Sequence, residues 1–251
     1  MDVWPVKALL IDIETSPILA DVWGIWQQNV GINQIKVPGE VICFAAKWYG
    51  EKKTIFKSSF HDSKPVMISE MHRVLSEADA VITYNGINFD RKWMNTEFLL
   101  AGMTPPDPSK NIDLLRVVKQ NFRFPSNKLQ YVLSALDLGS KASTGGHELW
   151  IRCMAGDPQA WATMKKYNIH DVVVMEPLYE RLLPWISGHP NVALIDGIEN
   201  GCPNCGSTDL ERRGFTRTTV STFQRFQCRK CGRWMRGNAR LAASTMTGVV
   251  Q

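Results

Sequence analysis

Leu9-Leu10-Ile11-Asp12-Ile13-Glu14-Thr15 is a short apolar run that ends with two carboxylates. A run of this length, ended by polar residues, predicts a buried β-strand over residues 6–13. Side chains two positions apart on a strand point the same way, so Asp12 and Glu14 project together. In open α/β sheets, ligands bind at the carboxyl ends of the strands. The stretch therefore predicts an acidic site at one edge of an α/β sheet.

Two later motifs bring further acidic residues. Asn85-Gly86-Ile87-Asn88-Phe89-Asp90 follows a short predicted strand, and Asp90 opens a predicted helix that extends to about residue 101. Asp157-Pro158 opens a longer helical pattern that reaches about residue 186. In that pattern Tyr167 and Asp171 are four residues apart, so they share one helix face. Asp113 is ambiguous, because it is either a cap for the helix that follows or a residue near the substrate.

The remaining pattern alternates predicted strands and helices, which is typical of an α/β fold with a mixed sheet flanked by helices. Strands are predicted over 6–13, 41–49, 54–57 and 80–83, with a further strand ending at 112–113. Helices are predicted over 64–77, 90–101, 114–121 and about 126–138, with Ser126 as an N-cap.

The order of these motifs resembles that of the DEDD (DnaQ-like) 3′–5′ exonuclease superfamily in its tyrosine branch. The chain is similar in particular to the exonuclease domains of family B DNA polymerases over roughly residues 6–185. The resemblance implies an RNase H-like fold. The histidine branch places its histidine five residues before the last aspartate, where this chain has Lys166, so the spacing favours tyrosine and His170 is expected to be solvated or packed.

The resemblance also implies roles for the five motif residues. It implies that Asp12, Glu14 and Asp171 bind one divalent ion, that Asp12 bridges to a second, and that Asp90 helps to hold the second through water. It assigns to Tyr167 the orientation of the attacking water. Two cations ~3.5–4 Å apart can activate water and stabilise the leaving oxygen of a phosphodiester. Hard oxygen ligands suit Mg²⁺ or Mn²⁺, so two such ions are the expected cofactors.

Four of the six cysteines form two pairs, Cys202-x-x-Cys205 and Cys228-x-x-Cys231. Four thiolates with this spacing predict one tetrahedral Zn²⁺, and the segment resembles a zinc ribbon. A glycine follows each pair, and a hairpin is expected around Gly214. The module is too small to fold on its own apolar core, so the metal is expected to be structural. Cys43 and Cys153 lie in other contexts and are expected to be packed side chains.

The charge of the chain is unevenly distributed. Residues 1–200 hold 20 Lys and Arg against 22 Asp and Glu, a net charge of −2, whereas residues 201–251 hold 9 against 2, a net charge of +7. Aromatic residues interleaved with arginines can stack bases and contact phosphates. The residues predicted to contact nucleic acid are Asn85, Phe89, Arg213, Arg217, Arg225, Arg229 and Arg233. The alternatives are a solvated basic face and aromatic residues that only cover the small core.

These observations predict an exonuclease domain over 1–187, a linker over 188–201, a zinc ribbon over 202–236 and a disordered tail over 237–251. The predicted function is metal-dependent 3′–5′ exonuclease activity on single-stranded or 3′-ended DNA, with RNA as the other substrate. A structure-specific endonuclease and a non-catalytic nucleic-acid-binding protein are the alternatives. A phage or mobile-element enzyme of DNA replication, repair or recombination would suit the layout, with a polymerase or recombination protein as partner.

The sequence contains no apolar run of ~18 residues, and no charged segment followed by an apolar core begins the chain. The prediction is therefore a cytoplasmic protein that does not enter a membrane, located in the host cytoplasm if a phage encodes it.

Overall fold

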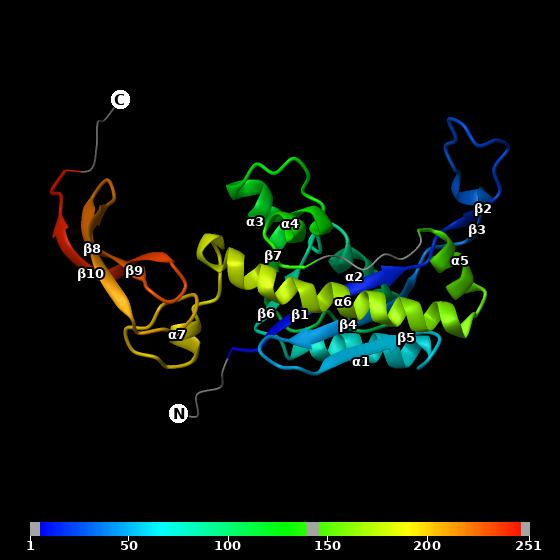
Figure 1. Cartoon of the computed structure of the whole chain (residues 1–251), viewed down its shortest axis with the longest axis horizontal. Coiled ribbons are helices and arrows are strands. Elements are labelled where there is room, and N and C mark those ends of the chain that lie inside the picture. The colour runs from blue at the N-terminus through cyan, green and yellow to red at the C-terminus, as the bar shows by residue number, and fades with distance from the viewer. Residues whose placement is uncertain (1–5, 140–145, 247–251) are drawn as a thin grey trace. The chain divides into compact units, whose positions relative to one another are not determined.

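The computed structural model describes residues 6–139 and 146–246 of the chain (Figure 1). These residues form two compact units. The first is Lys7–Tyr179, and the second contains the chain from Glu180 onward together with Val6. The first unit carries the three acidic motifs, and the second carries the four paired cysteines.

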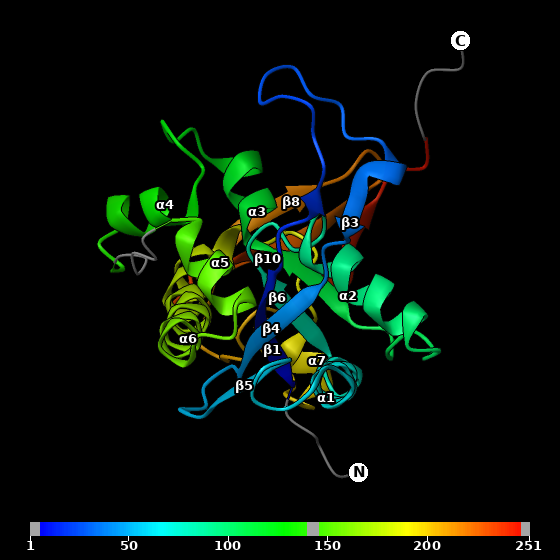
Figure 2. The same cartoon turned by 90° about the vertical axis from the view of Figure 1, so that its right-hand side faces the viewer.

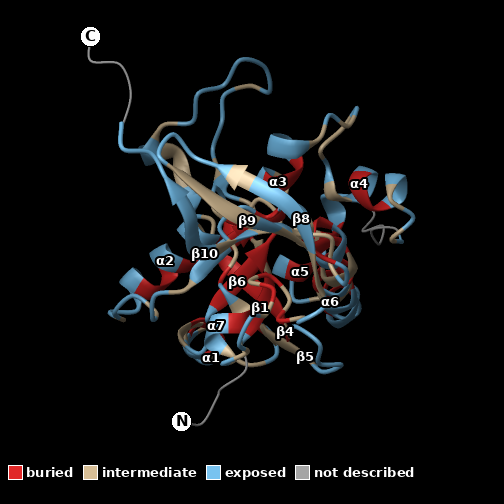
Figure 3. Cartoon of the chain, turned by 90° about the vertical axis from the view of Figure 1, so that its left-hand side faces the viewer, coloured by how far each residue is buried: buried red, intermediate tan, exposed pale blue. Residues whose placement is uncertain are grey.

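The first unit contains a mixed five-stranded sheet in the order β5-β4-β1-β6-β7. Strand β1 pairs with β4 in the antiparallel sense and with β6 in the parallel sense, as expected for a mixed sheet. The strands are β1 (Ala8–Thr15), β4 (Val41–Trp48), β5 (Thr54–Ser58), β6 (Ala80–Thr83) and β7 (Lys110–Asp113). Figure 3 shows that buried residues concentrate on β1, β4 and β6, so this sheet is the centre of the core.

Helices cover both faces of the sheet, and Figure 2 shows α1 and α6 on opposite sides of it. Alternate β1 residues Leu9, Ile11 and Ile13 pack in one cluster with α1 and α2. Helices α5 and α6 pack with Ile42 and Cys43 of β4 on the other face. The helices are α1 (Lys64–Ser76), α2 (Asp90–Leu100), α3 (Leu114–Asn121), α4 (Leu129–Ala135), α5 (Glu148–Met154) and α6 (Pro158–Leu182).

Local structure departs from the sequence prediction at several places in this unit. The short strands β2 (Leu19–Ala20) and β3 (Ile35–Val37), the 3₁₀ helix Ile32–Gln34 and α5 were not predicted. Helix α4 begins at Leu129 with Lys128 at the N-cap, because the Ser126 hydroxyl accepts its bond from the Lys128 N–H, before the helix starts. In the part of the chain that the structure describes, no helix combines the length and apolarity needed to cross a membrane.

The second unit contains a three-stranded antiparallel sheet in the order β10-β9-β8. Its elements are the 3₁₀ helix Leu183–Trp185, α7 (Val192–Ile195), β8 (Leu210–Arg217), β9 (Ser221–Cys228) and β10 (Trp234–Ala243). Helix α7 lies in the segment predicted to be a linker, where the Asn191 side chain caps it by accepting from the Leu194 N–H at 3.1 Å.

Two predictions for this unit were wrong. Residues 237–243 belong to β10 rather than to a disordered tail. Backbone pairing with β9 holds them in the sheet although their sequence has no apolar periodicity. Residues 247–251 of the predicted tail lie outside the described residues. The hairpin turn is at 218–220 and not at Gly214. Gly214 has a φ of 69° and lies at a register shift inside β8, so its conformational freedom serves a bulge.

Candidate metal centres and nucleic-acid interface

Three carboxylates converge between β1 and α6. Asp12 and Glu14 lie on the face of β1 opposite to Leu9, Ile11 and Ile13, and Asp171 comes from α6. One ligand oxygen from each of the three lies within 4.8 Å of the others. Asp171 is 2% exposed, and Asp12 and Glu14 are half-buried. Three like charges at this separation repel one another where water is scarce, so the donor set fits a hard divalent cation.

Asp90 adjoins this cluster but is not one of its three members. Its Oδ1 accepts a hydrogen bond from the Ile13 N–H at 3.3 Å, which attaches the start of α2 to β1 between Asp12 and Glu14. The parallel pairing of β6 with β1 ends at Leu10. Beyond that point the Asp90 carboxylate accepts the hydrogen bond of the Ile13 N–H in place of a neighbouring strand. Burial raises the pKa of Asp90 to about 6, and the charge of Asp113 adds to that rise.

Asn168 is a residue of the site that sequence reasoning missed. Its Nδ2 donates to Asp12 Oδ2 at 2.8 Å and to the Asp12 carbonyl at 3.3 Å, and the residue is fully buried. Its Oδ1 accepts from the Cys43 thiol at 3.9 Å. Burial raises the pKa of Cys43, and Glu14 and Asp12 raise it further, so the thiol keeps its proton. The signal in the sequence was an amide on the buried face of the Tyr167–Asp171 helix.

Tyr167 is buried on α6, one helical turn before Asp171. Its ring packs edge-to-face on Trp150, with a centroid distance of 6.1 Å, in a cluster with Cys43 and Met164. His170 instead lines a surface pocket of about 520 Å³, together with His61, Lys165 and Lys166. Tyr167 is thus a packed side chain, whereas His170 lines a surface pocket.

Asp113 acts as the predicted helix cap, and it also holds the loop before Asp90. Its side chain accepts from the Leu115 N–H at 3.0 Å, and it accepts from the Asn85 and Ile87 N–H groups at 2.9 and 3.3 Å. Asn85 adopts a φ of 72°, a conformation that asparagine tolerates. Phe89, at the end of this loop, is exposed and lies 6.3 Å from Trp93 by ring centroids.

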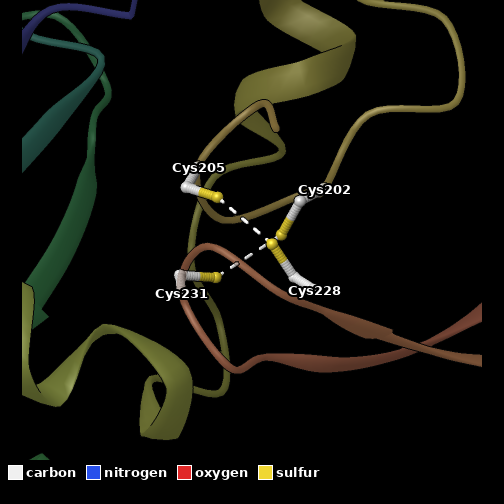
Figure 4. Close-up of side chains that lie close together, drawn as sticks. All are labelled: Cys202, Cys205, Cys228 and Cys231. Atoms are coloured by element: carbon white, nitrogen blue, oxygen red, sulfur yellow. Dashed lines mark hydrogen bonds between the residues drawn. The ribbon is translucent and has the colours of Figure 1, made fainter. Parts of the chain in front are cut away.

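The four paired cysteines converge in the second unit (Figure 4). Their sulfur atoms all lie within 4.8 Å of one another. Two of the separations, Cys202 to Cys231 and Cys205 to Cys228, are 3.7 Å. A tetrahedron of sulfurs around zinc, with bonds of about 2.3 Å, has an edge of about 3.8 Å. The four thiols are free of disulfides, and their spacing fits one Zn²⁺.

The backbone around the cysteines supports the same donor set. Gly206 and Gly232 have φ values of 70° and 79°, and each donates its N–H to the carbonyl of the first cysteine of its pair. Burial raises the pKa of Cys205 to about 11. Burial acts on Cys228 in the same direction, but hydrogen bonds from the backbone of Cys231 and Lys230 outweigh it and lower the pKa of Cys228. Thiolate is the form that binds metal.

The arginines predicted to contact nucleic acid differ in their surroundings. Arg233 donates to the Pro184 carbonyl at 2.9 Å, and Arg229 and Arg213 lie 3.5 and 3.1 Å from Glu211 Oε2. Arg217 and Arg225 are exposed, and the Arg225 guanidinium lies 5.0 Å from the centre of the Trp234 ring.

Arg236 of β10 was not among the residues predicted to contact nucleic acid. Arg236 is exposed and lies 4.0 Å from the centre of the Phe223 ring. Arg213 and Arg229 share the Glu211 carboxylate, which partly neutralises their charge. Arg225 donates to the Arg213 carbonyl and lies over Trp234, and Arg236 lies over Phe223, and neither a carbonyl nor a ring neutralises a guanidinium. Arg225 and Arg236 therefore keep their charge for a polyanion.

Residues 31–183 match the RNase H superfamily. The chain belongs to this superfamily. The matched segment includes Asp90, Tyr167 and Asp171 and begins after Asp12 and Glu14. Membership supports nuclease activity in general and the use of divalent metal ions, and the predicted RNase H-like fold is confirmed.

Among solved structures, the chain is similar to a family B DNA polymerase from the hyperthermophilic archaeon Pyrobaculum calidifontis, with a TM-score of 0.55 and 16% sequence identity. The match covers 86% of this chain and 32% of the polymerase. At this identity the likeness concerns the fold. No curated protein matches the sequence.

Proposed function

We propose that this protein is a metal-dependent 3′–5′ exonuclease of the DEDD superfamily, in its tyrosine branch, that acts on DNA in preference to RNA. The observation that carries the proposal is the convergence of Asp12, Glu14 and Asp171 within 4.8 Å, from segments about 160 residues apart in sequence. Asp90 adds support, because it is bonded to the residue between Asp12 and Glu14. Membership of the RNase H superfamily is consistent with this chemistry.

The residues would act as follows. Asp12, Glu14 and Asp171 would hold one Mg²⁺ or Mn²⁺, and Asp12 with Asp90 would hold a second. When bound, such a pair of ions activates water and neutralises charge on the leaving oxygen. Asn168 keeps the Asp12 carboxylate in one orientation through its 2.8 Å bond. The Tyr167 hydroxyl would orient the attacking water.

The second unit would assist binding. Cys202, Cys205, Cys228 and Cys231 would hold one structural Zn²⁺ and so form a zinc ribbon. Exposed arginines such as Arg217 and Arg225 would contact phosphates and raise the local concentration of the strand near the acidic cluster. An acidic cluster attracts a polyanion poorly without its cations, which is the physical reason for a separate basic module.

A cleavage assay with 5′-labelled single-stranded DNA tests the proposal. In Mg²⁺ or Mn²⁺ the chain should shorten the strand stepwise from its 3′ end, and Asp12→Ala should abolish the shortening. A covalently closed single-stranded circle should stay intact. Cleavage of the circle would indicate an endonuclease instead. Binding without any cleavage in either metal would indicate a non-catalytic nucleic-acid-binding protein.

A further inference from the structure

Residues 21–34, between β2 and β3, form a loop whose largest side chains are exposed; we call it the aromatic loop. Trp23 is 99% exposed, Ile32 90%, Ile25 84% and Trp26 81%. Figures 1 and 2 both show this segment projecting beyond β2 and β3, away from the sheet of its own unit. Apolar side chains grouped on a surface in this way mark a binding site more often than they mark solvent contact.

The base of the aromatic loop is closed by specific bonds. The Asp21 N–H donates to the Gln34 carbonyl at 2.9 Å, and Gln34 Nε2 donates to the Asp21 carbonyl at 2.9 Å. Gln34 Oε1 accepts from the Gly31 N–H at 2.7 Å, and Lys36 pairs with Asp21 at 2.8 Å. Polar contacts thus close the loop, and its tryptophans contribute little to the core. Their exposure therefore calls for another explanation.

The aromatic loop grows from the edge of the sheet that carries the carboxylates. Strand β1 ends at Thr15, directly after Glu14, and the next residue, Ser16, donates its N–H to the Glu40 carbonyl at 2.8 Å. The Glu40 N–H donates in return to the Ser16 hydroxyl at 3.0 Å. These two bonds hold the ends of the segment that carries the loop, and the segment begins two residues after Glu14. The loop is therefore attached to the sheet edge that carries the acidic cluster.

The chemistry of the aromatic loop suits nucleobases better than phosphates. Residues 22–35 contain no charged side chain, but they contain two tryptophans and several amides. Every base offers a flat face that can stack on an indole. Its edges can accept hydrogen bonds from side-chain amides or donate hydrogen bonds to them. Phosphate contacts would call for lysine or arginine, which the loop lacks.

We infer that the aromatic loop binds unpaired bases of the nucleic-acid strand whose 3′ end lies at the carboxylate cluster, with Trp23 and Trp26 as stacking platforms. This inference rests on the proposed nuclease function, and it adds how the substrate is selected. A single-stranded end presents the faces of several bases, whereas a blunt duplex end exposes one face of its terminal pair and keeps the other bases stacked. The loop would therefore favour single-stranded or frayed 3′ ends over blunt duplex ends.

The test uses the full chain with Asp12→Ala, so that no probe is degraded, and measures binding by fluorescence anisotropy. One probe is a labelled 12-mer of oligodeoxythymidylate, and the second is the same chain length built entirely of abasic sites. The variant is Trp23→Ala with Trp26→Ala. The control is Leu99→Ala with Leu100→Ala, two similarly exposed apolar side chains on α2. Because both tryptophans are exposed, the variant should fold like the parent.

The expected result is a loss of roughly 5-fold to 150-fold in affinity for the thymidylate probe for each base that no longer stacks. Affinity for the abasic probe should not change, and the control variant should bind both probes like the parent. Trp23→Phe with Trp26→Phe should restore most of the affinity, since phenylalanine keeps a stacking face.

Three results would overturn the inference. Unchanged affinity for the thymidylate probe would mean that the loop does not bind bases. Equal losses for both probes would mean that it contacts the sugar-phosphate chain. A change from dimer to monomer by light scattering, with unchanged oligonucleotide binding, would make the loop a self-association surface. Cleavage by the chain with Asp12 intact is measured separately. If this chain does not cleave DNA, the proposed nuclease function is rejected. If it cleaves DNA but gives any of the three results above, only the inference about the loop is rejected.

Discussion

Nδ2 of Asn168 lies 2.8 Å from Oδ2 of Asp12, and the hydrogen bond between them joins α6 to β1 at the acidic cluster. The same amide donates to the Asp12 carbonyl, so both the backbone and the carboxylate of Asp12 are held. Since α6 carries Asp171, this contact sets the separation of two of the three clustered carboxylates. Asn168 is therefore a positioning residue in the proposed site.

Replacing Asn168 should lower activity and raise the Mg²⁺ requirement, and a loss of stability alone would not change the Mg²⁺ requirement. Asn168→Ala should lower kcat by about 10-fold to 100-fold, because a 1 Å misplacement in an active site can cost that much. It should also raise the Mg²⁺ concentration needed for half-maximal activity. Loss of the buried amide should cost about 1–3 kcal/mol of stability. Activity against Mg²⁺ concentration and thermal unfolding are the measurements.

The matched control is Asn204→Ala. Asn204 is also buried, and its Nδ2 donates to the Leu183 carbonyl at 2.7 Å within the second unit. It should lose stability with an unchanged Mg²⁺ requirement. If Asn168→Ala behaves in the same way as Asn204→Ala, the asparagine is only a structural residue.

The Tyr167 hydroxyl should contribute to turnover and little to substrate affinity. Tyr167→Phe keeps the ring that packs on Trp150, so the fold should be preserved. Loss of a water-positioning hydroxyl should lower kcat by about 10-fold to 10³-fold, on the scale of general acid–base effects, with KM nearly unchanged. Tyr179→Phe, at a buried tyrosine near the end of the same helix, is the control. A silent Tyr167→Phe together with an inactive His170→Ala would reject the tyrosine-branch assignment.

The sequence could predict elements that obey local rules. Helix α3 begins directly after its cap Asp113, and α6 begins after Asp157, whose side chain accepts from the Gln159 N–H at 2.8 Å. Strand β1 and the projection of Asp12 with Glu14 follow from the apolar run and the two-residue period of a strand. Such features depend on neighbours in sequence, and so they can be read from one sequence.

Features that depend on distant partners could not be read in the same way. The bond from Asn168 to Asp12 joins residues 156 positions apart. Residues 237–243 belong to strand β10 through its pairing with β9, although most of them are small or polar. Gly214 permits a turn or a bulge equally well, and the partner strand decides which forms: Arg225 donates to the Arg213 carbonyl and Gln224 to the Gly214 carbonyl. The conformational propensities of the individual residues do not determine these features.

Asp113 should contribute to the free energy of unfolding through two segments, helix α3 and the loop before Asp90. It caps α3 and holds the Asn85 and Ile87 N–H groups, so Asp113→Ala leaves several partly buried donors without an acceptor. The expected loss is about 2–4 kcal/mol, from one cap and the bonds to a charged acceptor. Chemical denaturation measures it. Asp107→Ala, an exposed aspartate in the preceding loop, is the control. A loss below about 1 kcal/mol would contradict the double role.

The exposed arginines of the second unit should set the salt dependence of binding. Arg225→Gln with Arg236→Gln should weaken binding to single-stranded DNA. It should also reduce the slope of log affinity against log salt concentration by about 0.7 for each phosphate that an arginine no longer neutralises. Arg73→Gln is the control, because Arg73 is already paired with Glu70 on α1. An unchanged slope would mean that these arginines form an ordinary solvated face.

Removal of zinc should unfold the second unit and leave the first intact. The purified chain should contain one Zn²⁺, measured by mass spectrometry of the metal. A strong chelator or Cys228→Ser should release it, because one thiolate of four is removed by the substitution. Without the metal, the sheet of β8, β9 and β10 has little buried apolar surface to hold it, since most of its residues are exposed or half-buried.

Amide hydrogen exchange resolves the two units in this experiment. Protection should disappear in β8–β10 and persist in β1, β4 and α6. Oligonucleotide affinity and its salt slope should fall together, while cleavage at saturating substrate and Mg²⁺ persists, since the acidic cluster belongs to the first unit. Cys153→Ala, at a buried free thiol of the first unit, should retain zinc and keep the protection of β8–β10. Protection of β8–β10 that survives complete zinc removal would show that the four cysteines are not needed as metal ligands for folding.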